Sequence, residues 1–282
     1  MAQLITGDIK DLDGFNVKRI LPNQAKKMVG PFIFLDHMGP ADFAAGEGIN
    51  VRPHPHIGLS TLTYLLEGSM LHRDSLGNVQ EITPGEVNWM TAGKGIVHSE
   101  RETFEVRSAP HRANGLQFWV ALPPEKAEIE PSFQHLKREE LPHRYLHKTF
   151  MRLVAGEAYQ MVSPVRTHWP MYLIDVLSQP GEAIELPEHE ENALYIQSGG
   201  VCVNGEVFQA GDFVLLEKGE VIMVNETSRF VMVGGKAFAE KPYIRWNYVA
   251  WSRERIQQAE DDWLHQRFPK VPGDELEYTP AP

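Results

Sequence analysis

Two short motifs in this chain place histidine at a spacing that suits metal binding. They are His-Pro-His at positions 54–56 and His-Ser-Glu at positions 98–100. In an extended strand, side chains two residues apart lie on the same face, about 6.7 Å apart along the strand. The outer residues of each motif would therefore point the same way. If the two strands meet inside a β-barrel, three imidazoles and one carboxylate converge on a single ion.

The ligands of that ion would be His54, His56, His98 and Glu100. Imidazole and carboxylate without thiolate suit iron, manganese, nickel, copper or catalytic zinc better than a structural zinc site. The alternative interpretation is a solvated histidine loop followed by an ordinary Ser-Glu turn. The second motif, with the same spacing as the first, favours the metal site over that alternative.

The elements around the motifs are predicted to be strands. Short apolar runs, such as residues 32–37 and 59–66, are separated by Gly and Pro, and no apolar set before residue 46 recurs at helical spacing. Residues 74–78 have the chemistry of a hairpin turn. The sequence therefore predicts antiparallel strands in a barrel or a sandwich.

Three segments are expected to be something other than strands. Residues 122–143 are polar and contain proline, which predicts a linker with at most one helical turn. Ser252 can cap a helix that runs to about Phe268. Residues 269–282 are rich in Pro and Gly and predict an extended tail.

The second half of the chain repeats the plan of the first. Residues 64–68, Tyr-Leu-Leu-Glu-Gly, match residues 195–199, Tyr-Ile-Gln-Ser-Gly. The same eight-residue step separates a pair of glycines at 85 and 93 and another pair at 211 and 219. These matches predict an internal duplication of one β-domain.

The duplicated copy lacks the imidazoles of the metal site, although Glu226 stands at the position of Glu100. Glu185 and Pro187 stand at the positions of the two histidines of the first motif, unless a slip of two residues brings in His189. Val224 stands at the position of His98. One histidine alone would be a poor site, so we expect the second copy to be structural, or to form a wall and an interaction surface.

Charge and cysteine content restrict the partners and the compartment. The 282 residues contain 27 Lys and Arg against 38 Asp and Glu, a formal net charge of −11. This balance disfavours direct binding to nucleic acid, although a local basic patch or a protein partner stays open. Cys202 is the only cysteine, which favours a reducing cytoplasm, although a cysteine-poor secreted protein would look the same. Residues 1–14 lack the apolar core of a signal peptide and no stretch is long enough to cross a bilayer, so we expect a cytoplasmic protein without membrane contact.

The segment around the first motif resembles the signature of the pirin family, a branch of the cupin proteins. It runs from Arg52 to Gly68 as Arg-Pro-His-Pro-His-Ile-Gly-Leu-Ser-Thr-Leu-Thr-Tyr-Leu-Leu-Glu-Gly. Generic cupins place a glutamate a few residues after His-x-His, but residues 59–64 contain no acid here. The carboxylate arrives instead as Glu100, a displacement in which the chain is similar to pirins. The resemblance extends over nearly the whole chain.

This resemblance implies an all-β bicupin with two antiparallel β-barrel or jelly-roll domains and a short C-terminal helix. We expect a metal-binding cupin at residues 1–140 and a degenerate cupin without a metal at residues 141–245. The helix and tail, residues 246–282, are expected to pack back on the barrels.

The resemblance also implies a cofactor, one divalent metal ion held by His54, His56, His98 and Glu100. Iron as Fe²⁺ is the expected ion, with manganese, nickel, cobalt, copper and zinc as alternatives. Bacterial members similar to this chain are associated with quercetin 2,3-dioxygenase activity, which opens the flavonol ring with O₂. The resemblance to eukaryotic pirins implies another function, that of a redox-responsive regulator that binds a protein partner. We therefore expect a dioxygenase, with a non-enzymatic regulator as the alternative and another cupin chemistry, such as isomerisation, less favoured.

Several other side chains enter the expected mechanism or are set aside. Glu100 is expected to be both a ligand and the general base that takes the proton of the flavonol 3-hydroxyl. Phe118 and Trp119 point to opposite faces of one strand, so one of them lines the pocket. His72, on the arm of the hairpin, is expected to face solvent, and His37 is expected at a turn or rim.

Overall fold

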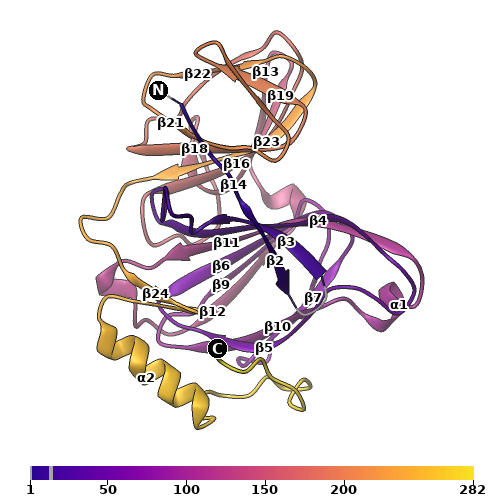
Figure 1. Cartoon of the computed structure of the whole chain (residues 1–282), viewed down its shortest axis with the longest axis vertical. Coiled ribbons are helices and arrows are strands. Elements are labelled where there is room, and N and C mark those ends of the chain that lie inside the picture. Colours follow the sequence, from indigo (N-terminus) through magenta and orange to yellow (C-terminus); the bar gives the residue numbers. More distant parts are fainter. Residues whose placement is uncertain (1, 13–14) are drawn as a thin grey trace. The chain divides into compact units, whose positions relative to one another are not determined.

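The computed structural model describes residues 2–12 and 15–282, which divide into two compact units. The unit that contains both histidine motifs, here called the histidine unit, comprises Ile9–Arg19, Leu35–Arg138 and Ala239–Pro282. The other, here called the apolar unit, comprises Met1–Asp8, Ile20–Phe34 and Glu139–Phe238. Strands dominate both units (Figure 1), which confirms the predicted all-β class.

Two sheets form the histidine unit, and strands of the smaller sheet carry both motifs. The larger sheet has the order β12 (Ser132–Leu136), β9 (Val87–Thr91), β6 (Leu59–Glu67), β11 (His111–Ala121), β4 (Phe32–Phe43), β3 (Phe15–Leu21) and β2 (Asp8–Leu12). The smaller sheet has the order β5 (Asn50–His56), β10 (Ile96–Arg101), β7 (Met70–Asp74) and β8 (Val79–Ile82). A short pair, β24 (Tyr243–Arg245) and β25 (Tyr248–Ala250), completes the strands of this unit.

The apolar unit has the same strand order. Its larger sheet runs β1 (Gln3–Ile5), β21 (Phe213–Leu216), β18 (Glu191–Ser198), β23 (Ser228–Gly235), β16 (Met171–Ser178), β14 (Thr149–Ala158) and β13 (His143–Leu146), with β15 (Met161–Val162) paired to β14. Its smaller sheet runs β17 (Ala183–Glu185), β22 (Val221–Val224), β19 (Gly200–Val203) and β20 (Glu206–Gln209). Strand for strand, β18 corresponds to β6, β17 to β5 and β22 to β10, as the predicted duplication requires.

The sheets of each unit stay separate in their hydrogen bonding. No ladder among the described strands joins a larger sheet to a smaller one, so each unit is an open jelly-roll of two sheets. Of the two predicted forms, a barrel or a jelly-roll, the structure shows the jelly-roll. Alternation along the strands turns one face of each sheet toward the interior of its unit. The inward side chains of the two sheets therefore meet without a closed barrel.

The interior of the apolar unit is filled by hydrophobic side chains. Both of its sheets contribute to one core, which includes Leu153, Ile174, Leu194, Val224 and Phe230. Val224, the residue at the position of His98, is thus a packing residue. This core is consistent with the structural role that we predicted for the second copy.

Helical segments are short, and one predicted boundary was wrong. Helix α2 (Arg253–Leu264) begins after Ser252, whose hydroxyl accepts a hydrogen bond from the Arg255 amide at 3.2 Å, as expected for a cap. It ends at Leu264, four residues before the predicted end at Phe268. The remaining helical turns are α1 (Phe104–Arg107), η1 (Pro124–Lys126) and η2 (Arg138–Glu140).

The segment predicted to be a linker, residues 122–143, contributes a strand instead. Within it, β12 pairs with β9 in a continuous register from Ser132 opposite Thr91 to Leu136 opposite Val87. β12 lies at the edge of the sheet, and only Leu136 of its five residues is buried, which agrees with its polar sequence. The domain boundaries that we expect at residues 140 and 245 stay predictions.

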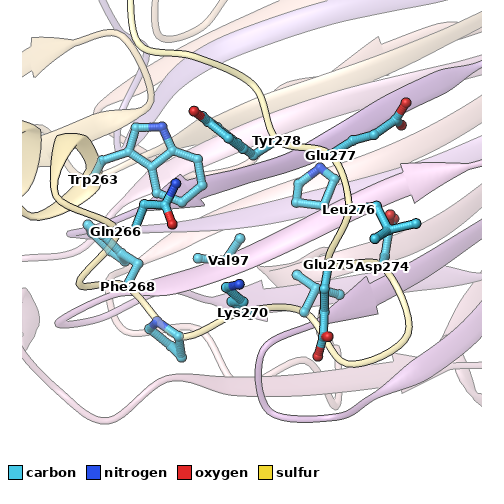
Figure 2. A pocket seen from close by; sticks show the side chains of 13 residues that line it. Val97, Trp263, Gln266, Phe268, Lys270, Asp274, Glu275, Leu276, Glu277 and Tyr278 are labelled. Atoms are coloured by element: carbon cyan, nitrogen blue, oxygen red, sulfur yellow. The ribbon is translucent and has the colours of Figure 1, made fainter.

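The C-terminal tail lies against the strands that carry the histidine motifs. The Thr279 amide donates to the Pro53 carbonyl at 2.8 Å, and the Trp263 indole donates to the Thr279 carbonyl at 3.0 Å. Figure 2 shows the tail and the end of α2 around a cavity of about 220 Å³, with Trp263, Phe268 and Tyr278 among its lining residues. The tail thus backs β5 and β10 on the face opposite to their histidines.

Among the helices of residues 2–12 and 15–282, none combines the length and the hydrophobicity that a membrane crossing requires. The cytoplasmic location expected from the sequence stays a prediction.

Candidate metal centre

Pairing of β5 with β10 sets the two histidine motifs side by side. The ladder is antiparallel and puts Ile96 opposite His56 and His98 opposite His54. Directly paired residues point to the same face of a sheet, so all three imidazoles enter the interior of the histidine unit. An irregularity follows, because Glu100 pairs with Val51 and the register shifts between His98 and Glu100. This bulge displaces the carboxylate from the histidines.

The structure brings His54, His56 and His98 together in a buried cluster. The ring centroids of His54 and His98 are 4.4 Å apart, and each lies 5.0 Å from the ring of His56. The three side chains are 8%, 1% and 1% exposed, respectively. Ligand atoms from these three residues lie within 4.8 Å of one another, close enough to bind one ion.

Hydrogen bonds at Nδ1 orient two of the three rings. Nδ1 of His54 lies 2.8 Å from the Arg52 carbonyl oxygen, and Nδ1 of His56 lies 3.0 Å from the Asn247 carbonyl oxygen. A carbonyl oxygen only accepts, so each Nδ1 carries the proton and each neutral ring keeps its lone pair on Nε2. This is the arrangement that orients metal-binding histidines in proteins.

Burial also keeps these imidazoles neutral. It lowers the pKa of His54 to about 4. The pKa values of His56 and His98 fall well below 6.5 because of burial and, second, because of the neighbouring imidazoles. Near neutral pH all three rings therefore offer a lone pair, which is the state that a metal needs.

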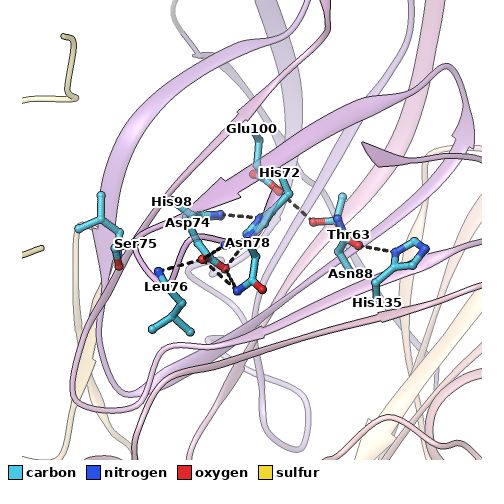
Figure 3. Close-up of polar contacts among 11 residues, drawn as sticks. Thr63, His72, Asp74, Ser75, Leu76, Asn78, Asn88, His98, Glu100 and His135 are labelled. Carbon is cyan, nitrogen blue, oxygen red and sulfur yellow. Dashed lines mark hydrogen bonds and ion pairs between the residues drawn. The ribbon is translucent and has the colours of Figure 1, made fainter. Parts of the chain in front are cut away.

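Glu100 lies beside this cluster, on the side of His98. Its carboxylate groups with His98 and His72 within 4.8 Å, a second set of ligand atoms that could hold an ion. Among the described residues, the two sets share only His98, so the carboxylate does not form one compact group with all three predicted histidines. Glu100 is buried, and the Thr63 hydroxyl donates to its Oε1 at 2.9 Å (Figure 3). Burial raises the pKa of the Glu100 carboxyl, against opposing effects of His72 and of the Thr63 hydrogen bond.

One ring nitrogen of the cluster lacks a hydrogen-bond partner among the described residues, which bears on whether a metal fits here. Nε2 of His98 is buried and has no hydrogen-bond partner among the described residues. Leaving such an atom unpaired costs about 1–3 kcal/mol, and native proteins rarely accept that cost without a reason. The atom belongs to a cluster of neutral imidazoles with a carboxylate nearby, a donor set that suits a divalent transition metal. The residues therefore fit the ion that the sequence suggested.

His72 belongs to the centre, and the expectation that it faces solvent was wrong. It is 3% exposed, and it pairs with Glu100 across β7 and β10. Its Nε2 lies 3.0 Å from Oδ2 of Asp74, which is fully buried. The sequence alone could not identify it, because the alternation of residues 70–74 does not tell which face of the strand is covered. In the structure, residues 70, 72 and 74 are the buried positions of β7, while 71 and 73 are partly exposed. Polar residues on the buried face of a strand indicate a site.

Two other expectations about side chains are resolved by the structure. Trp119 lies next to the centre, since its ring centroid is 5.0 Å from that of His56 in an edge-on arrangement. Phe118 is fully buried on the other face of the same strand. His37, expected at a turn or rim, is instead buried within β4, with Nε2 2.8 Å from Oδ1 of Asn114.

Two jelly-roll units of equal topology, one with a histidine centre and one with an apolar core, define a bicupin with a candidate metal centre. The sequence profile of the Pirin family matches residues 14–120, and the profile of the Pirin C-terminal cupin domain matches residues 173–269. The chain belongs to the pirin family. The predicted bicupin fold is confirmed.

Similar proteins match along almost the full chain. A pirin-like protein of Caulobacter vibrioides is 45% identical over 280 residues, which are 97% of this chain and 96% of that protein. Pirin of Homo sapiens is 31% identical, over 87% of this chain and 85% of its own. A crystal structure of quercetin 2,3-dioxygenase from Acinetobacter baumannii superposes with a TM-score of 0.92 at 34% identity, covering 100% of this chain and 95% of that one.

Proposed function

We propose that this protein is a metal-dependent dioxygenase of the quercetin 2,3-dioxygenase type, which uses O₂ to open the ring of a flavonol. The observation that carries the proposal is the buried cluster of three neutral imidazoles, with Nε2 of His98 unpartnered among the described residues. The similarity over the whole chain to the Acinetobacter baumannii protein, solved as a quercetin 2,3-dioxygenase, supports the choice of reaction.

His54, His56 and His98 would hold the ion, and Glu100, whose carboxylate groups with His98, would join them as the fourth ligand. Iron as Fe²⁺ is our proposed metal, and manganese, nickel, cobalt, copper and zinc are alternatives because the same donors bind all of them. When bound, a divalent cation supplies Lewis-acid stabilisation for negative charge on the 3-oxygen of the flavonol.

Glu100 is our proposed general base. Its carboxylate lies buried beside His98 and His72, where it can take the proton of the flavonol 3-hydroxyl and return it later. The hydrogen bond from Thr63 holds one oxygen of the carboxylate and leaves the second free to move toward the substrate. Burial of the side chain keeps competing water away from this transfer.

Trp119 provides an aromatic surface at the side of the centre. Its edge-on contact with His56 places an indole next to the expected position of the substrate rings. An aromatic flavonol can pack against such a surface, and this contact would orient the substrate relative to Glu100.

The test is reconstitution of the metal-free protein with Fe²⁺ without oxygen, followed by addition of quercetin and air-saturated buffer. We expect uptake of O₂ together with loss of the flavonol absorption band. The His56→Ala variant should lose both, while the matched variant His143→Ala, which removes an exposed histidine of β13, should keep both.

Two results would decide against the proposal. Equal turnover in the wild-type protein and in His56→Ala would place the chemistry elsewhere. Tight binding of iron without any turnover would favour the alternative, a metal-dependent regulator that binds a protein partner.

A further inference from the structure

A chain of buried polar groups leads from Nδ1 of His98 away from the metal centre. Nδ1 of His98 lies 3.4 Å from Nδ1 of His72, and Nε2 of His72 lies 3.0 Å from Oδ2 of Asp74 (Figure 3). The side chains of His98, His72 and Asp74 are 1%, 3% and 0% exposed, respectively. Strand pairing aligns the three groups, because His98 stands opposite Asp74 and Glu100 opposite His72.

The hairpin after β7 makes Asp74 an acceptor. The backbone amides of Leu76 and Asn78 donate to its Oδ1 at 2.9 Å and 3.1 Å, and the side-chain amide of Asn78 donates to both oxygens. Backbone N–H groups cannot accept, so the carboxylate receives every one of these bonds. Its bond to His72 therefore has the ring nitrogen as donor.

The direction of the hydrogen bond between His72 and Asp74 determines the tautomers of His72 and His98. If Nε2 of His72 carries the proton, the neutral ring has its lone pair on Nδ1. That lone pair faces Nδ1 of His98 and accepts its proton in a hydrogen bond. His98 is then left with a lone pair on Nε2, the atom that has no other partner among the described residues. Phe133 stacks on His72 at 4.4 Å between ring centroids with 14° between the planes, which holds the relay ring in place.

We propose that Asp74 and His72 form a positioning relay that sets the tautomer of His98 and presents its Nε2 to the metal. The proposal rests on the metal centre proposed above. Backbone carbonyls of Arg52 and Asn247 do the same for the other two histidines. His98 uses a side-chain pair instead, so a change in the hairpin at residues 74–78 reaches the metal through a single hydrogen-bonded path.

The decisive variant is Asp74→Asn. Its amide oxygen can still accept from the hairpin amides, but its NH₂ group would face Nε2 of His72. His72 would then carry its proton on Nδ1 and face His98 with a donor. His98 would move its own proton to Nε2 and lose the lone pair that binds metal. Loss of the partner of a ligating histidine typically weakens metal affinity by about 10–100-fold.

The matched control is Asp175→Asn in β16. Asp175 is also a buried carboxylate, 3% exposed, and it accepts two hydrogen bonds from Arg229 in the apolar unit. A second relay variant, His72→Phe, removes the acceptor for His98 and keeps a ring that can stack on Phe133. Thermal unfolding of each metal-free variant verifies that it is folded before metal is added.

Two measurements test the relay. The first is the dissociation constant of Co²⁺, from competition with a chromophoric chelator; we expect about 10–100-fold weaker binding for both relay variants and less than twofold change for the control. The second is the tautomer of His98 in the metal-free protein, from the ¹⁵N shifts and ¹H–¹⁵N couplings of its ring. We expect a protonated Nδ1 in the wild type and a protonated Nε2 in Asp74→Asn.

The outcomes are distinguishable. Equal Co²⁺ affinity and an unchanged His98 tautomer in Asp74→Asn would overturn the relay. A wild-type protein that fails to bind Co²⁺ would overturn the proposed metal centre, and the ring shifts of the metal-free protein would still test the relay.

Discussion

His54 and His98 stand directly opposite each other on β5 and β10, with their ring centroids 4.4 Å apart. Each ring is buried, and one ring nitrogen of each belongs to one set of converging donors. Two neutral imidazoles in contact attract each other only weakly, whereas a cation bound between them would interact favourably with both lone pairs. The register of β5 and β10 therefore places two imidazoles where one cation could bind to both.

Removing one of the converging histidines should release the metal. We expect His54→Ala to bind Fe²⁺ at least about 100-fold more weakly, because one donor is lost and the remaining set is incomplete. Metal content after dialysis, measured by atomic emission, tests this. The variant His189→Ala, in the apolar unit, should retain the wild-type content. Retention of full metal content in His54→Ala would show that this residue is not a ligand.

Replacing the proposed base should separate binding from chemistry. Glutamine has the size of glutamate and can still accept the Thr63 hydrogen bond, but it cannot take a proton. We therefore expect Glu100→Gln to keep part of its metal and to lose about 10²–10⁴-fold in quercetin turnover. Steady-state rates normalised to metal content provide the measurement. Ring opening at the wild-type rate would exclude Glu100 as the base.

Acid should destabilise the metal-free protein in a window set by its buried histidines. Above pH 6.5, His54 is neutral in both the folded and the unfolded state, so its titration has no effect on stability. Between pH 6.5 and the folded pKa of about 4, the unfolded state binds a proton that the folded state does not. The free energy of unfolding should fall by about 1.4 kcal/mol per pH unit for this group alone.

Urea unfolding at pH 7.5, 6.0 and 5.0 measures that loss. His56 and His98 have lowered pKa values for the same reason and add to the slope. A His54→Gln variant removes one titrating group, so its stability should depend less steeply on pH. A free energy of unfolding that stays constant over this range would contradict the burial of neutral imidazoles.

The C-terminal tail should stabilise β5 and β10 by packing on the face opposite to their histidines. Arg101, the residue after Glu100, donates from Nε and Nη2 to the two oxygens of Asp274 at 2.8 Å and 2.9 Å. These side chains are 22% and 14% exposed, so screening by water is incomplete. We expect Arg101→Ala to lower the free energy of unfolding by about 1–2 kcal/mol. Its control is Arg245→Ala, which removes a largely exposed ion pair with Glu260 and should change stability by less than about 0.5 kcal/mol.

Much of the architecture followed from local patterns in the sequence. The spacing of His54 and His56 placed both on one face of a strand, because strand geometry alternates regardless of what the strand pairs with. Ser252 marked the start of α2, since a cap acts on amides only a few residues away. The repeated spacing of glycines revealed the duplication for the same reason, as turns are formed by their own residues.

Long-range pairing decided the rest of the centre. Burial of His72 depends on β7 lying beside β10, and alternation within β7 cannot say which of its faces is covered. The displacement of Glu100 comes from a bulge between β5 and β10, which is a property of the pair of strands. The tautomer of His98 depends on Asp74 through His72, and hydrogen bonds between side chains exist only once the strands are in register. The candidate donors could therefore be predicted from the chain, whereas their orientation and their hydrogen-bond partners required the folded sheets.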